Sequence, residues 1–344
     1  MYPIEELLFL AISALVCGIN DWQKTVIFGD QKLEWLRKYF PYKNGICSPD
    51  TFERLFSAID VTQFEECFRN WVNDISKLSQ GEVIAIDGKT MRGSYDIAKG
   101  TNAQHIVSAY ATQAHLSLGQ EVVNQKSNEI TAIPELLNLL SINGCVVTID
   151  AMGCQHKIAT KILDKNADYI LAAKLNQKDL HEQIEKVFGL TRIADTDTNI
   201  DTGHGRVETR KCCVINDLTF LDGKEKWDGI KSIVKIETER YNKTTQLTNK
   251  EMRYYISSLN DSASIFNQNI RSHWAIENNL HWMLDVSFGE DQSRRRLKNH
   301  AVNYNIMAKT ALGLLKNSPQ KIPISHKKQK AILNDDFRAK ILGV

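Results

Sequence analysis

The chain has 344 residues, 42% of them hydrophobic and 24% charged, so it can bury a sizeable core in roughly two to three domains, or in one domain with an insertion. Its formal net charge of +2 neither requires nor excludes a nucleic-acid partner, because basic residues can be concentrated locally. Its seven cysteines form no Cys-x-x-Cys motif, and the odd number argues against a disulfide framework and favours a reducing, cytoplasmic location.

The first 80 residues are predicted to be all-helical. The apolar run 7–17 follows Glu5 and Glu6 rather than Lys or Arg, which excludes a signal peptide, and it is too short to span a bilayer. Further helices are expected over 31–39, from Pro49 onward and over 62–78. Small helical regions of this kind often bind DNA, and an equally good interpretation of region 1–80 is a brace packed on the rest of the chain.

Two apolar runs of the chain end in an aspartate. Residues 83–86 lead to Asp87, and residues 145–149 lead to Asp150. Such runs are typical of short buried strands. One of them alone carries little information, because Asp is common where a strand turns. Two in one domain indicate carboxylates that converge at the carboxyl ends of neighbouring strands.

The elements around these strands follow a recognisable order. In chain order we expect a hairpin of two strands (105–112 and 120–125), a helix (128–140), the strand that leads to Asp150 (145–149), a helix (154–163), a strand (169–172) and a helix (177–188). The hairpin turn is expected to hold Gly119. This is the order of a ribonuclease-H-like mixed α/β sheet. It predicts Asp87 on the central first strand and Asp150 on the strand beside it.

Helical periodicity fades over residues 191–260. Strands separated by Gly and Asp/Asn turns are expected there, at 207–215, 230–241 and 252–258. We interpret 191–260 as a β-rich insertion in an α/β domain made of 81–190 and 261–316, with helix returning after Asp261. The last segment, 317–344, is predicted to be a basic C-terminal tail, of which residues 321–330 are polar enough to be mobile.

Two aspartates alone do not make a phosphoryl-transfer site. Such a site typically holds two divalent ions, and a third acid completes the ligand set while the ions relieve carboxylate repulsion. The candidate is Glu277, which a helical pattern places beside the apolar stripe of Ile276 and Leu280. Glu290 and Asp291 are further candidates, but they lie beyond the regular helical pattern, where a carboxylate is less well positioned.

The same helix offers a zinc alternative. His273, Glu277 and His281 are spaced four residues apart, and two ligands at that spacing are a known zinc device. All three along one helix span about 12 Å of its axis, which is too far for one ion. A solvated polar face is the remaining interpretation, and the neighbouring Trp274 and Trp282 argue against it.

Basic residues near the predicted site are candidates for contacts with DNA phosphates. For the two that follow Asp87, a solvated turn is an equally good interpretation, whereas phosphate contact is favoured for the downstream arginine cluster. The candidates are Lys89, Arg92, Arg294, Arg295 and Arg296.

Specific motifs extend over nearly the whole chain. They are AIDGKTMRGS (85–94), LGQEVV and KSNEITAIPELL (within 118–137), TIDAMGCQ (148–155), GHGRVETR (203–210), YYISSL (254–259) and HWAIENNLHWMLDVSFGED (273–291). With these motifs the chain resembles the H-repeat-associated transposases, a branch of the bacterial insertion-sequence transposases with a DDE catalytic triad. Related enzymes outside this branch place Tyr, Arg and Lys around the glutamate, where this chain has Ile270, His273 and Leu284.

The resemblance implies a ribonuclease-H-like fold with an inserted β region and cleavage and joining of DNA ends that depend on Mg²⁺ or Mn²⁺, with two ions. Carried over by position, the catalytic and metal-binding triad is Asp87, Asp150 and Glu277. The implied partner is double-stranded DNA, both element ends and target, bound by a homo-oligomer at the nucleoid in the bacterial cytoplasm. The alternatives are an inactive DNA-binding remnant and a nuclease of the same fold, which Mg²⁺-dependent nicking and end-joining would distinguish.

Overall fold

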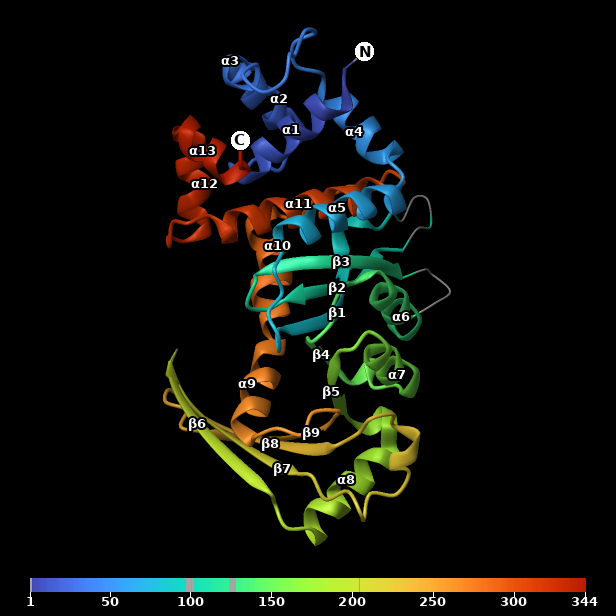
Figure 1. The fold of residues 1–344 in the computed structure, drawn as a ribbon. Coiled ribbons are helices and arrows are strands. Elements are labelled where there is room, and N and C mark those ends of the chain that lie inside the picture. The colour runs from blue at the N-terminus through green and yellow to red at the C-terminus, as the bar shows by residue number, and fades with distance from the viewer. Residues whose placement is uncertain (1, 97–99, 101, 124–127, 204) are drawn as a thin grey trace.

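A computed structural model describes residues 2–96, 100, 102–123, 128–203 and 205–344. Within these residues a nine-stranded mixed sheet has the order β3-β2-β1-β4-β5-β9-β8-β7-β6 (Figure 1). The strands are β1 (Val83–Met91), β2 (Gln104–Ala111), β3 (Leu116–Val123), β4 (Val146–Ile149), β5 (Asp168–Ala173), β6 (Asp195–Gly203), β7 (Arg206–Ile215), β8 (Ser232–Asn242) and β9 (Thr248–Ser257).

Helices cover both faces of this sheet and one end of it (Figure 1). They are α1 (Ile4–Val16), α2 (Trp22–Gln31), α3 (Leu33–Leu36), α4 (Pro49–Ala58), α5 (Val61–Ile75), α6 (Glu129–Leu139), α7 (His156–Asp164), α8 (Lys178–Leu190), α9 (Ala263–His273), α10 (Trp282–Phe288), α11 (His300–Asn317), α12 (Ile324–Leu333) and α13 (Asp335–Leu342). The molecule is therefore a mixed α/β protein with one large sheet.

The centre of the sheet has the predicted neighbours. Strand β1 pairs antiparallel with β2 and parallel with β4, and Ile86 lies opposite Ile149 in the parallel register. The hairpin prediction is correct for its strands but wrong for its turn, because Gly119 lies inside β3, opposite Ala109 at a register shift. The predicted strand end at Gln125 lies outside the described residues.

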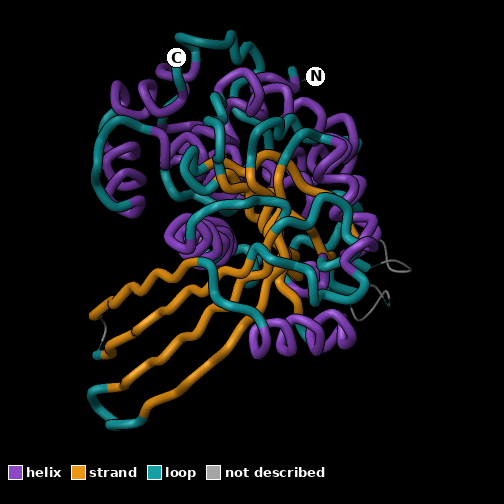
Figure 2. The backbone as a smooth tube through the Cα atoms, turned by 60° about the horizontal axis from the view of Figure 1, so that its bottom comes forward, coloured by secondary structure: helices purple, strands orange, loops and turns teal. Residues whose placement is uncertain are grey.

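The β-rich segment continues the main sheet, because β9 pairs antiparallel with β5. Figure 2 shows β6 to β9 as a four-stranded extension that projects away from the helices. Strand β6 was not predicted, since its sequence DTDTNIDTG lacks an apolar alternation and is rich in Asp and Asn, which are depleted in strands. It forms an exposed edge, where acidic side chains discourage pairing with another chain.

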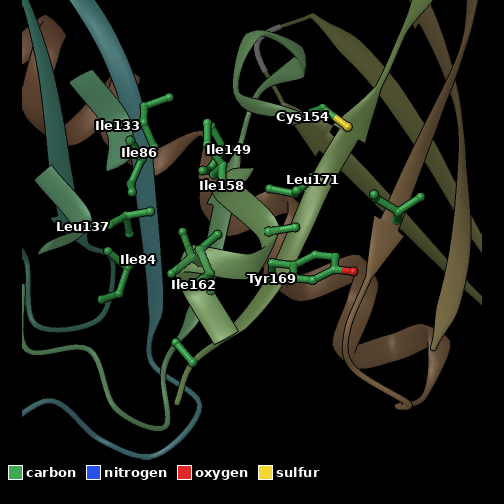
Figure 3. Packing of buried hydrophobic residues seen from close by; sticks show 14 of the residues in the cluster. Ile84, Ile86, Ile133, Leu137, Ile149, Cys154, Ile158, Ile162, Tyr169 and Leu171 are labelled. Carbon is green, nitrogen blue, oxygen red and sulfur yellow. The ribbon is translucent and has the colours of Figure 1, made fainter. Parts of the chain in front are cut away.

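Side-chain alternation along β1 gives the sheet two different faces. Ile84 and Ile86 pack with apolar residues of α6 and α7 (Figure 3). Ala85 instead belongs to the core formed with α10 and α11. Because residues two apart on a strand point to the same face, Asp87 shares the face of Ala85. The strand thus directs the Asp87 carboxylate toward the α9–α10 segment.

The N-terminal and C-terminal helices share one apolar core. Residues of α1 to α4 pack with residues of α10 to α13, and Figure 1 shows α12 and α13 beside α1 and α2. The prediction of a mobile C-terminal tail is therefore wrong. Lys327 donates a hydrogen bond to the carbonyl of Leu315, and Lys328 donates one to the carbonyl of Ser287. These lysines look like solvated charges in the sequence, but their stems and ammonium groups are buried in the fold.

The other N-terminal expectations are met in part. The helices expected from Pro49 and over 62–78 correspond to α4 and α5, whereas the one expected over 31–39 is only the short α3. Helix α2 was not predicted. Its N-terminus is capped by Asp21, whose side chain accepts a hydrogen bond from the backbone N–H of Lys24. No helix in the described part of the chain is long and apolar enough to cross a membrane.

Candidate active site

Asp87 and Asp150 lie side by side at the centre of the sheet. Asp87 is a residue of β1, and Asp150 directly follows β4, one step beyond the paired Ile86 and Ile149. Both aspartates line a cavity of about 260 Å³, and Glu277 lines the same cavity. The fold therefore brings together three acidic residues that are separated by up to 190 positions in the sequence (277 − 87).

Glu277 does not lie on the single regular helix that its spacing predicted. Helix α9 ends at His273, and Glu277–His281 form a π-helical turn that continues into α10. A π turn inserts an extra residue into the helical repeat and so changes which side chains share a face. As a result, Glu277 is exposed to the cavity, whereas His281 is buried with Nδ1 3.4 Å from Oδ2 of Asp87.

The surroundings of Asp87 and Asp150 disfavour the ionised form of both carboxyl groups. Burial and then the charge of Asp150 raise the pKa of Asp87 to about 7. Burial also raises the pKa of Asp150, with a further contribution from Glu129. Desolvation and like charges both disfavour the ionised form of a carboxyl group. A cation bound near these carboxylates would remove that penalty.

The donor set of the cavity fits a hard divalent cation. Carboxylate oxygens suit Mg²⁺ or Mn²⁺ better than zinc. Among the residues that the structure describes, no three His, Cys, Asp or Glu side chains already lie close enough together to hold an ion. A preformed cage of three carboxylates is therefore not present. Mg²⁺ does not require one, because it is commonly bound by one or two carboxylates together with waters and substrate phosphates.

The zinc alternative requires imidazole nitrogens that face a common ion, whereas a nitrogen of each histidine here has another neighbour. Nδ1 of His273 lies 3.0 Å from Oγ1 of Thr148 on β4, and burial lowers the pKa of His273 to about 4. Nδ1 of His281 lies 3.4 Å from Oδ2 of Asp87 on β1. The two histidines tie the α9–α10 segment to β4 and β1.

Two of the basic residues predicted to contact DNA, Lys89 and Arg295, are half-buried and already have partners within the protein. The ammonium of Lys89 forms ion pairs with Asp285 and Glu290, and its side chain is only 12% exposed. The guanidinium of Arg295 lies 3.2 Å from the ring centroid of Tyr304. Both cations are satisfied inside the protein and cannot meet a phosphate without breaking these contacts.

The other three candidates reach the surface to different extents. The Arg92 side chain is 83% exposed, with Nε 3.9 Å from Oδ2 of Asp291. Arg294 is exposed, and Arg296 is half-buried with its guanidinium 5.1 Å from the ring centroid of Tyr95. A contact between these residues and DNA stays a prediction.

Two further basic residues line the acidic cavity and were not predicted. Lys174 is exposed and directly follows β5, the strand next to β4. Arg253 comes from β9, and its guanidinium lies 4.9 Å from the ring centroid of Trp274. Lys174 could have been predicted in the same way as Asp87 and Asp150, because the carboxyl ends of neighbouring strands meet at one edge of the sheet. Arg253 could not be found that way, because the antiparallel pairing of β9 with β5 was not predicted.

Comparisons with known proteins identify the family of this chain. A family model described as Transposase DDE domain matches residues 78–314, and a second, described as DDE_Tnp_1-associated, matches residues 1–72. Putative transposase YncI of Escherichia coli O157:H7 is 41% identical, over 99% of this chain and 90% of that protein. H repeat-associated putative transposase YhhI of Escherichia coli K12 is 38% identical, over 99% of this chain and 93% of that protein.

The chain therefore belongs to the DDE transposase family, and its relatives include the H repeat-associated putative transposases, as the sequence resemblance predicted. Among solved structures, the piggyBac transposase synaptic complex with hairpin DNA is similar with a TM-score of 0.46 and 12% identity. That similarity covers 100% of this chain and 73% of the piggyBac chain.

Proposed function

We propose that this protein is a DNA transposase that nicks the ends of an insertion sequence and joins the freed 3′-hydroxyl to target DNA, on a ribonuclease-H-like core. The observation that carries the proposal is the placement of Asp87 on β1 and of Asp150 at the end of the adjacent β4, facing a cavity that Glu277 also lines. Membership in the DDE transposase family supports it. The three residues are proposed as the catalytic and metal-binding triad.

Asp87, Asp150 and Glu277 would hold two Mg²⁺ or Mn²⁺ ions with the help of DNA phosphates, and bound ions would supply charge neutralisation and activation of the attacking oxygen. The chain itself keeps the two aspartates in place on rigid strands, which catalysis by positioning requires. His281 holds the Asp87 carboxylate from the α10 side. Lys174 and Arg253 are proposed to bind DNA phosphates at the rim of the cavity.

The proposed reaction has two phosphoryl-transfer steps. A water oxygen attacks the phosphorus at the element end, the P–O3′ bond breaks, and a 3′-hydroxyl and a 5′-phosphate are left. The oxygen of that 3′-hydroxyl then attacks a phosphorus of target DNA, and a target 3′-hydroxyl leaves. The proposed partners are therefore both ends of the element and the target duplex, bound by a homo-oligomer at the nucleoid in the cytoplasm.

The test uses the full chain with labelled duplexes that carry the inverted repeats flanking its coding region. Nicking and strand transfer are expected with Mg²⁺ or Mn²⁺ and are expected to be weak with Ca²⁺ and absent with EDTA. Asp87→Asn, Asp150→Asn and Glu277→Gln should each abolish both steps while the protein still binds DNA. Glu182→Gln is the control, because Glu182 lies on the outside of α8 in a surface pair with Lys178.

Three outcomes would contradict the proposal in different ways. DNA binding without cleavage would identify an inactive remnant. Cleavage without joining would identify a nuclease of the same fold. Cleavage that survives EDTA or the loss of Asp87 would place the chemistry elsewhere in the protein.

A further inference from the structure

Glu129 is an acidic residue beside the candidate site that has no role in the function proposed above. It is the first residue of α6, and its Oε1 lies 2.7 Å from Nε2 of His105 on β2. Nδ1 of the same ring lies 2.8 Å from Oγ1 of Thr90 on β1. These contacts join the carboxylate to the central strands, so its position is set by the sheet.

Gly88, the residue after Asp87, provides the space that this carboxylate occupies. A Cβ at position 88 would lie 2.2 Å from Oε1 of Glu129 and 2.7 Å from Nε2 of His105. Such separations are far below van der Waals contact, so any larger residue would displace the pair. The Glu129 carboxylate therefore rests against the β1 backbone immediately next to Asp87.

Glu129 also acts electrostatically on both aspartates. After burial, its negative charge is the largest cause that raises the pKa of Asp150. It contributes, after burial and Asp150, to the raised pKa of Asp87. Helix α6 packs on the sheet face opposite to α10. Glu129 thus adds negative charge from the side of the sheet that Glu277 does not reach.

We infer that Glu129 is a fourth acidic group of the divalent-cation site and that its charge strengthens cation binding there. The inference rests on the proposed function, which assigns the cation to Asp87 and Asp150. In the metal-free protein the negative charge of Glu129 repels the negative charges of the two aspartates. Removing it should therefore weaken cation binding without lowering the stability of the metal-free fold. A residue that merely packs α6 onto the sheet would show the opposite pair of effects.

The experiment measures Mn²⁺ binding to the full chain by titration calorimetry and thermal unfolding of the metal-free protein. Glu129→Gln keeps the hydrogen bond acceptor for His105 and removes the charge. It should weaken Mn²⁺ binding about tenfold, the low end of the range for groups next to metal ligands, with a metal-free Tm at or above wild type. Glu135→Gln is the matched control, because Glu135 lies on the same helix and is exposed. It should leave Mn²⁺ binding unchanged.

Glu129→Asp retains the charge and should keep Mn²⁺ affinity within about threefold of wild type. The inference is overturned if Glu129→Gln binds Mn²⁺ like wild type, if it lowers the metal-free Tm, or if Glu129→Asp is as weak as Glu129→Gln. Asp87→Asn separates this failure from failure of the proposed function. If Asp87→Asn weakens Mn²⁺ binding and Glu129→Gln does not, only the role of Glu129 is wrong. If neither weakens it, the proposed cation site is wrong.

Discussion

The indole Nε1 of Trp22 donates a hydrogen bond to Nε2 of His300 over 3.0 Å, and the two rings stack at a centroid distance of 5.9 Å. This contact joins the second helix of the chain to α11, 278 positions further on. His300 is only 3% exposed. It must accept the indole proton through an unprotonated Nε2, so protonation of the ring would break the contact.

The first prediction concerns acid stability. Burial, with a smaller contribution from Arg295, lowers the pKa of His300 to about 4, below the ordinary value of 6.5. The folded state therefore binds fewer protons than the unfolded state between these values. The contribution of neutral His300 to the unfolding free energy is complete above pH 6.5 and is lost as the pH falls toward 4. At about pH 5 this residue alone lowers the unfolding free energy by ~2 kcal/mol.

His300→Gln can still accept the indole hydrogen bond but cannot be protonated. Between about pH 7.5 and 5 it should lose ~2 kcal/mol less unfolding free energy than wild type, measured by urea denaturation. His326→Gln is the control, because His326 is exposed on α12, and it should lose as much as wild type. An equal loss in His300→Gln and wild type would mean that His300 is not the acid-sensitive residue.

The second prediction separates the proposed third acid from the buried acid near it. Glu290 is 6% exposed, pairs with Lys89 and accepts a hydrogen bond from Asn305. Glu290→Gln leaves the buried ammonium with less compensating charge and should lower the unfolding free energy by roughly 3 kcal/mol. Glu277→Gln is at an exposed position and should change it by no more than about 0.5 kcal/mol while abolishing nicking.

Thermal unfolding and a nicking assay on the same preparations check this prediction. The rate at which Glu290→Gln cleaves DNA should be proportional to the fraction of the variant that is folded. Cleavage by Glu277→Gln at the wild-type rate, with a folded but inactive Glu290→Gln, would move the third acid to Glu290.

The third prediction contrasts two adjacent arginines. Arg294 is exposed, whereas Arg295 stacks on Tyr304 and donates to the carbonyl of Asn20. Arg294→Ala should weaken DNA binding and reduce the slope of its salt dependence by about one, with no change in Tm. Arg295→Ala should lower Tm by several degrees. Fluorescence anisotropy at several salt concentrations and thermal unfolding measure the two effects. An unchanged salt slope in Arg294→Ala would exclude its contact with phosphate.

The fourth prediction concerns the C-terminal helices. Arg338 on α13 is fully buried, with its guanidinium 3.9 Å from the ring centroid of Trp35 and Nη1 donating to the carbonyl of Ala331 over 2.8 Å. Arg338→Ala should lower the unfolding free energy by roughly 3 kcal/mol, because it removes a buried cation together with its packing and leaves acceptors unpaired.

Arg37→Ala is the matched control, since Arg37 is on the surface and pairs with the exposed Glu34. Its expected effect on unfolding is at most about 1 kcal/mol. Urea denaturation compares the two variants. Equal, small effects would mean that α13 is not part of the N-terminal core.

The sequence alone determined the features that depend on local pattern and element order. The apolar runs before Asp87 and Asp150 predicted buried strands, and the order of elements between them predicted that these strands are neighbours, which the parallel register of Ile86 with Ile149 confirms. Pattern and order suffice here because strand alternation and short crossover connections leave few ways to arrange the sheet. The motifs likewise identified the family.

Only the tertiary structure decided which charged side chains have partners inside the protein. Lys89 and Arg295 look like surface cations in the sequence, and their partners Glu290 and Tyr304 are recognisable only once the chain is folded. The π turn at Glu277 and the placement of Glu129 beside Gly88 have no local signature either. A charge is stabilised or exposed by groups that approach it from other elements, and side-chain periodicity in one segment carries no information about those groups.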